Sequence, residues 1–261
     1  MDLRLWTYSF YDAWNALSNF PFPMKLEEPE EDESADERFL ASFPLVGAAW
    51  GLGGAVVAWL VSALMPLSLA SAALSAILIV VAWEFLSAGG NVSGLAGYLS
   101  GALGRRGIRA EGSGGSLDFD VSGMTLFISL YLLKIVCVGA VIYNGRYSWL
   151  VVALALGGLV RSRLAADDSS GSALIPVEEP EAVAKSSWLI AAAVTLIAGF
   201  WYLPAALLAL LLAWGLIAVL ARTARSEPGE TPDATVDALG AAADMVFLIA
   251  GAALLAGIAN R

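Results

Sequence analysis

The chain has 261 residues and a net charge of −10; 59% of the residues are hydrophobic and only 15% are charged, with a mean hydropathy of +0.74. A soluble domain of this length cannot bury so much apolar surface, so the composition predicts an all-α polytopic membrane protein. With no histidine and one cysteine, Cys137, the sequence excludes histidine- or thiolate-bound metals, a histidine base and an intrachain disulfide. Any metal must therefore be a hard cation on oxygen ligands.

Residues 1–40 are expected to form a cytoplasmic segment, with an amphipathic helix and an acidic linker, ahead of a membrane domain over 41–261. The acidic run EEPEEDESADE (27–37) is interpreted as a solvated linker, and the alternative is a docking site for a basic partner. The sequence has no basic patch with interleaved aromatic residues, so nucleic acid is not an expected partner.

Seven apolar segments are candidates for membrane spans of about 20 residues each. They are expected near residues 41–65, 67–86, 124–143, 148–160, 187–201, 203–221 and 243–259. The fourth and fifth segments are short. The fifth and sixth meet at Tyr202-Leu203-Pro204, where a tight turn or a kink is expected. If this junction does not reverse the chain, the count becomes six.

Basic residues predict the orientation of the chain. Eleven of the fourteen lie in four polar stretches that share one side of the membrane if the spans alternate: 1–40, 87–123, 161–186 and 222–242. The opposite side holds only Arg146 and Arg261. This positive-inside bias predicts a multi-pass protein of the plasma (inner) membrane with cytoplasmic large loops, so chemistry is expected at the cytoplasmic mouth.

Carboxylates in the cytoplasmic loops are candidate ligands for Mg²⁺. Asp237 and Asp244 are seven residues apart, so both would project from one face of a helix that begins near Thr235. They could hold a cation, or they could cap the last span. Asp118 and Asp120 would share one face of an extended segment. The arginines before them could meet phosphate groups or simply flank the membrane.

Glu84 and Lys134 are ionisable residues at membrane depth. Such groups are costly in a bilayer, so they usually pair with each other or face a polar cavity. A buried ion pair between the second and third spans is therefore expected, with either a structural or a functional role.

Five short motifs occur in a characteristic order along the chain: AWNALSNFPFP (13–23), FPLVGAAWGLGGAV (43–56), LYLLKI (130–135), Ser162-Arg163 and TVDALGA (235–241). In this order they resemble the motifs of the cobalamin synthase (adenosylcobinamide-GDP ribazoletransferase) family, over nearly the whole chain. Asn19 stands where the first family motif has an arginine. Lys134 falls on the family's lysine, and Thr235 and Asp237 fall on the threonine and aspartate of its terminal T-G-D-x-L-G-A motif.

The stretch GGNVSGLAGYLSG (89–101) aligns without gaps with the family's main motif, G-x-H-L-D-G-L-A-D-x-x-D-G. It keeps Gly89, Gly94, Leu95, Ala96 and Gly101. Asn91 replaces the histidine, and Ser93, Gly97 and Ser100 replace the three aspartates. The downstream D-S-R-x-G-x-x-G element is also absent, and SLDFDVSG (116–123) occupies its place.

The resemblance implies a polytopic membrane enzyme that joins α-ribazole, or its phosphate, to adenosylcobinamide-GDP and releases GMP, with Mg²⁺. It makes Asp237 and Lys134 the candidate catalytic residues. The candidate substrate-binding residues are Gly89, Asn91, Gly94, Gly101, Arg163 and Thr235. The carboxylates that could replace the lost metal ligands are Asp118, Asp120, Asp237 and Asp244.

Pyrophosphate displacement requires a cation that neutralises phosphate oxygens and a carboxylate that positions the attacking hydroxyl. Two interpretations therefore stay open. In one, the chain catalyses with carboxylates from elsewhere. In the other, it is an inactive scaffold or regulatory subunit beside corrinoid-pathway enzymes or a paralogue. A small-molecule carrier is the third alternative. In each case membrane lipid is an expected partner.

Overall fold

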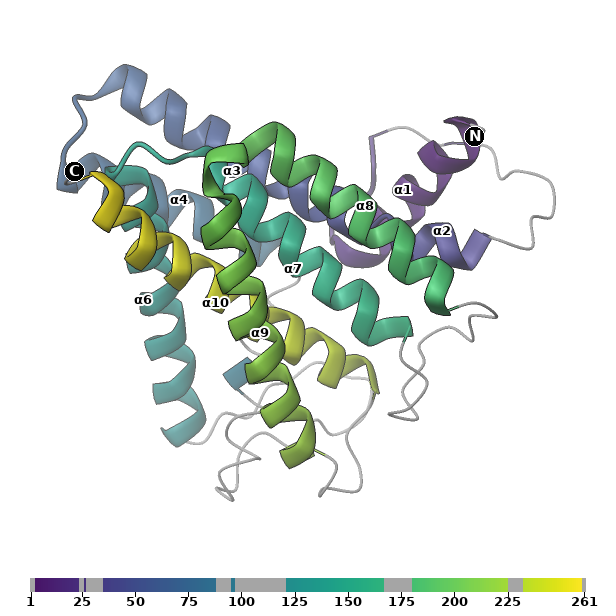
Figure 1. Ribbon diagram of the computed structural model, residues 1–261. Helices are drawn as coiled ribbons and strands as arrows, with labels where there is room; N and C mark the ends of the chain where they lie inside the picture. Colours follow the sequence, from purple (N-terminus) through teal and green to yellow (C-terminus); the bar gives the residue numbers. More distant parts are fainter. Residues whose placement is uncertain are drawn as a thin grey trace.

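The computed structural model describes residues 3–23, 26, 35–87, 95–96, 121–166, 180–224 and 232–259, without the side chains of 121–123, 180, 220–224, 232–237 and 254–259. The elements over these residues are helices, so the predicted all-α fold is confirmed (Figure 1). They are α1 (Leu3–Leu17), α2 (Ala35–Ala41), α3 (Phe43–Leu64), α4 (Leu69–Leu86), α6 (Val121–Tyr143), α7 (Ser148–Ala166), α8 (Pro180–Gly199), η2 (Phe200–Tyr202), α9 (Leu203–Ala224) and α10 (Pro232–Ala259).

Five helical stretches of the described chain are long and apolar enough to cross a membrane: Ala35–Leu64, Leu69–Leu86, Met124–Tyr143, Ser148–Ala166 and Glu181–Val219. Ala238–Ala253 is a shorter apolar helix. Large apolar side chains remain exposed on several of these helices, including Leu64, Leu69, Ile197 and Trp201. Apolar surface of this extent requires an apolar solvent, as a bilayer provides. The chain is therefore a polytopic membrane protein.

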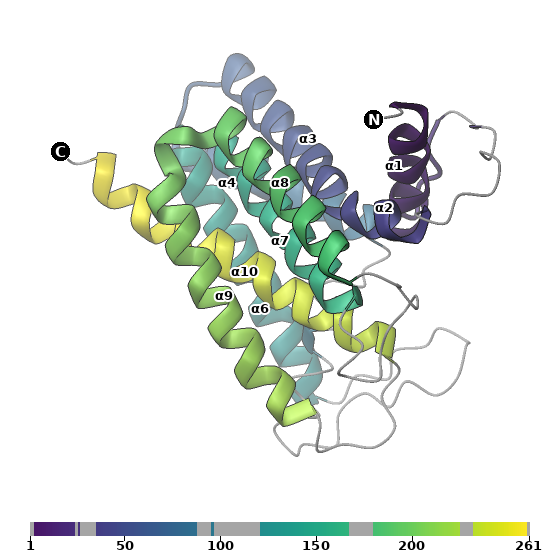
Figure 2. The ribbon, with the colours of Figure 1, turned by 45° about the vertical axis from the view of Figure 1, so that its right-hand side comes forward.

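The stretch Glu181–Val219 is broken at its middle. The 3₁₀ turn η2 separates α8 from α9, and Figure 2 shows the two helices leaving this turn in different directions. Pro204 occupies the first turn of α9, where its missing N–H has no helical partner to lose. The predicted turn is confirmed, and it lies at Phe200–Tyr202, just before the proline.

The fourth, fifth and last apolar helices are longer than the sequence predicts. Helix α7 continues through Arg161 to Ala166, α8 begins at Pro180, and α10 begins at Pro232 rather than near Thr235. Hydropathy finds only the apolar part of each helix. The polar turns at the ends belong to the same helices, because the backbone hydrogen bonds continue through them. In α7, Arg161 also has a buried ionic partner.

Helix α7 lies at the centre of the bundle, and close glycine contacts fix it against α3. A Cβ atom at Gly47 would overlap the Leu154 carbonyl oxygen, and one at Gly158 would overlap that of Phe43. Gly51 is similarly close to Leu150. The glycines of the FPLVGAAWG segment therefore allow two backbones to approach as small-xxx-small motifs do in membranes.

Helix α10 runs obliquely across the bundle and is attached to α7 at two levels (Figures 1 and 2). At the first, the Trp149 indole N–H donates to the Phe247 carbonyl at 3.0 Å, and this ring fills the space beside Gly251. At the second, Arg161 pairs with Asp244. These contacts place the first half of α10 beside the second half of α7, where the candidate site lies.

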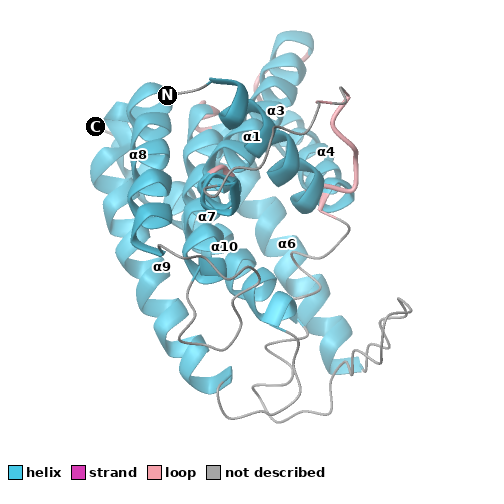
Figure 3. Cartoon of the chain, turned by 90° about the vertical axis from the view of Figure 1, so that its right-hand side faces the viewer, coloured by secondary structure: helices cyan, strands magenta, loops and turns pink. Residues whose placement is uncertain are grey.

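The N-terminal element, α1 with residues 18–23, packs against the first half of α3 (Figure 3). The ring of Phe22 makes edge contacts with Phe10, Tyr11 and Trp14 of α1, at centroid distances of 5.8–6.0 Å. The Trp14 indole in turn meets the Trp50 ring of α3 at 6.4 Å. Aromatic packing thus folds residues 18–23 back along α1 and holds them near α3.

Candidate functional site

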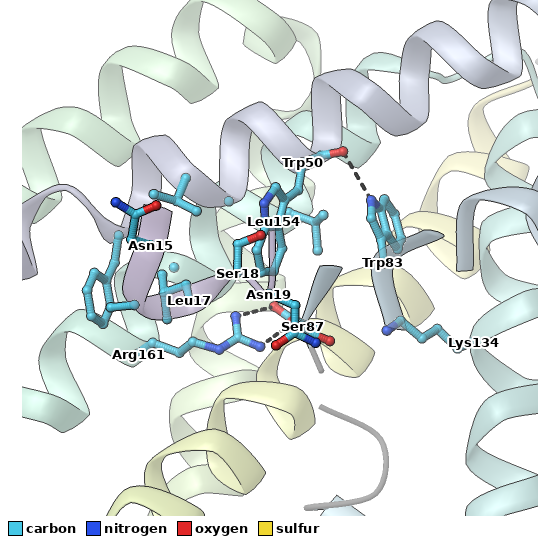
Figure 4. A pocket seen from close by; sticks show the side chains of 16 residues that line it. Asn15, Leu17, Ser18, Asn19, Trp50, Trp83, Ser87, Lys134, Leu154 and Arg161 are labelled. Carbon is cyan, nitrogen blue, oxygen red and sulfur yellow. Dashed lines mark hydrogen bonds and ion pairs between the residues drawn. The ribbon is translucent and has the colours of Figure 1, made fainter. Parts of the chain in front are cut away.

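A cavity of about 340 Å³ opens between α1, α3, α4, α6, α7 and α10 (Figure 4). Its walls come from residues far apart in the sequence. They are Asn15, Ala16, Leu17, Ser18, Asn19, Phe43, Val46, Gly47, Trp50, Trp83, Ser87, Lys134, Leu154, Gly158, Arg161 and Asp244. The volume lies at the small end of the ~300–1,000 Å³ typical of small-molecule sites, which combine apolar walls with a few placed polar groups.

One wall carries the ion pair between Arg161 of α7 and Asp244 of α10. Arg161 Nη2 lies 2.6 Å from Asp244 Oδ2, and Nη1 donates to Oδ1 at 3.3 Å. Their side chains are 9% and 6% exposed. Glycines provide the space, because a Cβ atom at Gly157 would overlap Asp244 and one at Gly240 would lie 2.5 Å from Arg161 Cγ. This two-point geometry is the strong form of the interaction.

Lys134 lines a second wall and forms the predicted ion pair with Glu84, which the structure confirms. Lys134 Nζ donates to Glu84 Oε1 at 2.7 Å, and the two side chains are 4% and 12% exposed. The ammonium also lies 5.8 Å from the centroid of the Trp83 ring, within reach of a cation–π interaction. The other oxygen, Glu84 Oε2, is buried and has no hydrogen-bond partner among the described residues.

Residues after α1 close a third side of the cavity. The Asn19 backbone N–H donates to the Leu86 carbonyl at 2.7 Å, and its side-chain amide donates to the Phe85 carbonyl at 3.4 Å. These carbonyls are among the last of α4, which have no partner within the helix. Asn15 Oδ1 accepts from the Phe22 N–H at 2.9 Å. Asn19, in the position of the family arginine, therefore links the N-terminal element to the end of α4.

Two residues of the glycine-rich stretch are described, and they show where it meets the bundle. Leu95 is buried and packs with Ala241, Ala242 and Met245 of α10, and Leu130 of α6 packs against the same cluster. Leu130 stands one helical turn before Lys134. The glycine-rich motif thus meets the helix of the terminal motif beside the lysine motif.

The predicted site residues divide into four groups. The structure brings two of them, Lys134 and Asp244, together in the lining of the cavity. Arg163 is partly exposed on α7 and is not among the lining residues, while the neighbouring Ser162 hydroxyl lies 2.6 Å from that of Ser187 on α8. Thr235 and Asp237 belong to the first turns of α10, and their side chains lie outside the described part. Gly89, Asn91, Gly94, Gly101, Asp118 and Asp120 lie outside the described residues.

Sequence reasoning missed several residues of the cavity. Arg161, two positions before the predicted Arg163, is the arginine that lines it. Trp50 and Trp83 form its aromatic wall, and Asn15, Ser18 and Ser87 add polar groups. Trp50 lies in the FPLVGAAWG segment, so the family motif was the sequence signal that could have identified it. The asparagines and serines carried none, because isolated polar residues are common at helix ends.

The described side chains do not fit a divalent cation. No cluster of three or more carboxylate or cysteine ligands occurs in the described part of the chain. Asp244, which lines the cavity, is bound by Arg161, and Glu84, behind the lining residue Lys134, is bound by that lysine, so neither offers a free charge to a metal. We therefore assign no step to Mg²⁺ at these residues.

Comparisons with known proteins identify the family of the chain. The family model described as cobalamin-5-phosphate synthase matches residues 9–256. Two proteins named adenosylcobinamide-GDP ribazoletransferase are similar to the chain over 257 residues, 93% of this chain and 98% of each relative. One, from Klebsiella pneumoniae strain 342, is 27% identical, and one from Klebsiella pneumoniae subsp. pneumoniae is 28% identical. No solved structure gives a significant match. The chain belongs to the cobalamin-5-phosphate synthase family.

Proposed function

We propose that the chain is a membrane-embedded transferase of the last steps of cobalamin biosynthesis, which joins α-ribazole, or its phosphate, to adenosylcobinamide-GDP and releases GMP. Both named relatives are adenosylcobinamide-GDP ribazoletransferases, and each is covered almost end to end. The proposal extends their activity to this chain.

One observation carries the proposal: residues of three separate family motifs, and a residue of the helix that carries a fourth, line the same cavity. The segment after α1 provides Asn19, the α3 motif provides Gly47 and Trp50, α6 provides Lys134, and the helix of the terminal motif provides Asp244. These residues are spread over more than 220 positions of sequence. Their convergence on one small polar cavity supports a shared substrate-binding role.

In this reaction the hydroxyl oxygen of α-ribazole forms a bond to the phosphorus next to cobinamide. The bond between that phosphorus and the GMP oxygen breaks, and the hydroxyl proton passes to a base. We assign the base to Asp237, because Asp244 and Glu84 are each neutralised by a cation. Asp237 stands two helical turns before Asp244 in α10. Lys134, with ammonium protons beyond the one that Glu84 accepts, can donate to substrate oxygens in the cavity.

The cavity lies near the end of α4 at Leu86 and receives the first half of α10, so it opens towards the side that holds the basic loops. We propose that this side is cytoplasmic and that the membrane is the plasma (inner) membrane. The other candidate substrate-binding residues, Gly89, Asn91, Gly94, Gly101, Arg163 and Thr235, belong to the same proposal. The proposal also includes Mg²⁺, with Asp118, Asp120 and Asp237 as its remaining candidate ligands. Corrinoid-pathway enzymes are the proposed partners.

A second candidate function is a substrate-binding or scaffold subunit without catalysis. The observation in its favour concerns the carboxylates: the stretch 89–101 has none, and Asp244 is paired with Arg161. Such a subunit would bind a substrate in the cavity and co-purify with corrinoid-pathway enzymes but would release no GMP.

The two functions are separated by a transfer assay on membranes that contain this chain and no other family member. The assay supplies adenosylcobinamide-GDP and α-ribazole and measures GMP and cobalamin. The transferase is expected to form both, and Asp237→Asn is expected to abolish both. Asp36→Asn, the same change at an exposed position of α2, serves as the control and should leave the rate unchanged. Absence of both products with folded wild-type protein would support the scaffold instead.

A further inference from the structure

The short turns after α3, α6 and α8 lie together at one end of the bundle (Figure 1). The Tyr147 hydroxyl lies 2.8 Å from the Ser62 hydroxyl of α3, which joins the second turn to the helix before the first. The guanidinium carbon of Arg146 lies 5.9 Å from the centre of the Tyr202 ring, which joins the second turn to the third. We call this end the short-turn face; its turns are residues 65–68, 144–147 and 200–202.

Arg146 is the only charged residue of these turns. The three stretches that contain them, 42–83, 121–166 and 182–226, have no aspartate or glutamate. Arg146 Nε is buried and has no hydrogen-bond partner among the described residues. Buried polar groups normally have partners, and a charge that is partly withdrawn from water normally has a counterion. The short-turn face therefore carries a positive charge that its own turns do not neutralise.

Aromatic side chains are exposed at the same face. Tyr143, directly before the second turn, is 52% exposed, and Phe200 and Trp201 of η2 are 60% and 85% exposed. Exposed aromatic residues at the ends of membrane helices collect at the level of the lipid headgroups. The anions at this level are lipid phosphates, and a planar guanidinium binds phosphate oxygens through two N–H groups. The surroundings of Arg146 thus favour a phospholipid headgroup over a soluble anion.

A groove of about 390 Å³ lies beside the second turn. It is lined by Ala55, Val56 and Trp59 of α3 and by Gly145, Tyr147 and Ser148 around the turn. The α3 side is apolar, and the turn side carries the hydroxyls of Tyr147 and Ser148. An acyl chain along α3 gains dispersion contacts with Val56 and Trp59, which are 46% and 60% exposed, while its headgroup stays at the polar turn that holds Arg146.

We propose that the short-turn face binds one anionic phospholipid, with the lipid phosphate on Arg146 and an acyl chain along α3 in the groove. The preference for a lipid of net negative charge follows from the missing counterion, because a zwitterionic headgroup brings its own cation to the phosphate. A lipid in this position contacts both α3 and the turn before α7. The inference depends on the membrane location of the chain and is independent of the proposed transfer reaction.

The test starts with the wild-type full chain in nanodiscs that contain equal amounts of phosphatidylglycerol and phosphatidylcholine with the same acyl chains. Native mass spectrometry of the released protein counts the retained lipids. We expect phosphatidylglycerol to be retained at least about fivefold more often than phosphatidylcholine, the factor that one arginine near an anionic headgroup supplies. Equal retention would overturn the proposal. Displacement of the lipid by inorganic phosphate would also overturn it, because the site would then be one for soluble anions.

Arg146→Gln should remove the preference for phosphatidylglycerol. Arg146→Lys, which keeps the charge, should retain more of the preference than Arg146→Gln does. Lys185→Gln is the matched control, because it removes one positive charge from an exposed position of α8 where Glu181 already lies 3.8 Å away. The control should behave as the wild type. An unchanged preference in Arg146→Gln, or an equal loss in Lys185→Gln, would contradict the assignment to Arg146.

Val56→Gln tests the groove separately from the headgroup. A polar side chain on the apolar wall should lower the retention of both lipids several-fold and leave their ratio unchanged. Val219→Gln makes the same change at an exposed valine of α9 outside the groove, and retention should stay at the wild-type level. Equal retention in these two variants would overturn the placement of the acyl chain along α3.

Discussion

The guanidinium of Arg161 and the carboxylate of Asp244 form a buried two-point ion pair that joins α7 to α10, with Nη2 and Oδ2 2.6 Å apart. The pair makes part of the cavity wall and occupies a carboxylate that the sequence offers as a metal ligand. The pair holds α10, the helix of the terminal motif, against the central helix α7. This role has consequences for stability that can be measured separately from activity.

Asp244→Asn should lower the free energy of unfolding by about 3–5 kcal/mol, because it leaves the buried Arg161 guanidinium without a compensating charge. Thermal or denaturant unfolding in detergent measures the change. Glu181→Gln breaks an ion pair whose side chains are 77% and 91% exposed and should change stability far less. Similar unfolding for the two variants would contradict a structural role for the Arg161–Asp244 pair.

Gly47→Ala should destabilise the protein by about 1–3 kcal/mol, because the added Cβ would overlap the Leu154 carbonyl oxygen and separate α3 from α7. Gly53→Ala on the same helix is the control, since nothing lies within 4 Å of its Cβ position. That variant should be neutral or slightly stabilising, because alanine favours a helix over glycine by up to ~1 kcal/mol. Equal effects of the two changes would show that the close helix approach is not needed.

Glu84→Gln and Lys134→Gln should not have additive effects on stability. Each single change leaves one buried charge unpaired, whereas the double variant leaves none, so a coupling energy of about 0.5–3 kcal/mol is expected. A double-mutant cycle of unfolding free energies measures it. Additive values would mean that the two groups act independently despite their 2.7 Å contact.

Chelation of divalent cations should leave the unfolding midpoint unchanged, because the buried carboxylates Asp244 and Glu84 are held by Arg161 and Lys134 rather than by a metal. The same treatment should stop GMP release if Asp237 and the substrate phosphates together bind Mg²⁺. Unfolding scans and transfer assays with and without EDTA separate the two effects. A clear loss of stability on chelation would contradict the description of the cavity walls.

Much of the fold was predictable from hydropathy. The seven apolar segments correspond in order to α3, α4, α6, α7, α8, α9 and α10 among the described helices, and the turn before Pro204 follows from its sequence. The polar ends of α7 and α10 were not predictable in the same way. Hydropathy assigns Arg161 and Asp237 to loops, because it cannot include the tertiary partner that keeps Arg161 in a buried helix.

The contacts of the candidate site were also only partly predictable from the sequence. The pairing of Glu84 with Lys134 was predictable, because two opposite charges at membrane depth on adjacent spans have few other partners. The pairing of Arg161 with Asp244 was not, because 83 positions separate them and each has an ordinary explanation near a helix end. Family resemblance placed the motifs in order, but only the packing of α3, α7 and α10 shows that they share one cavity.

GMP release by the purified chain in nanodiscs shows whether the protein is a transferase. The measurement supplies adenosylcobinamide-GDP with α-ribazole, and then each substrate alone. An active transferase forms GMP and cobalamin in equal amounts when both substrates are present, none with either alone, and none as Asp237→Asn. Folded wild-type protein that binds α-ribazole yet releases no GMP from the pair, with Mg²⁺ present, would contradict it.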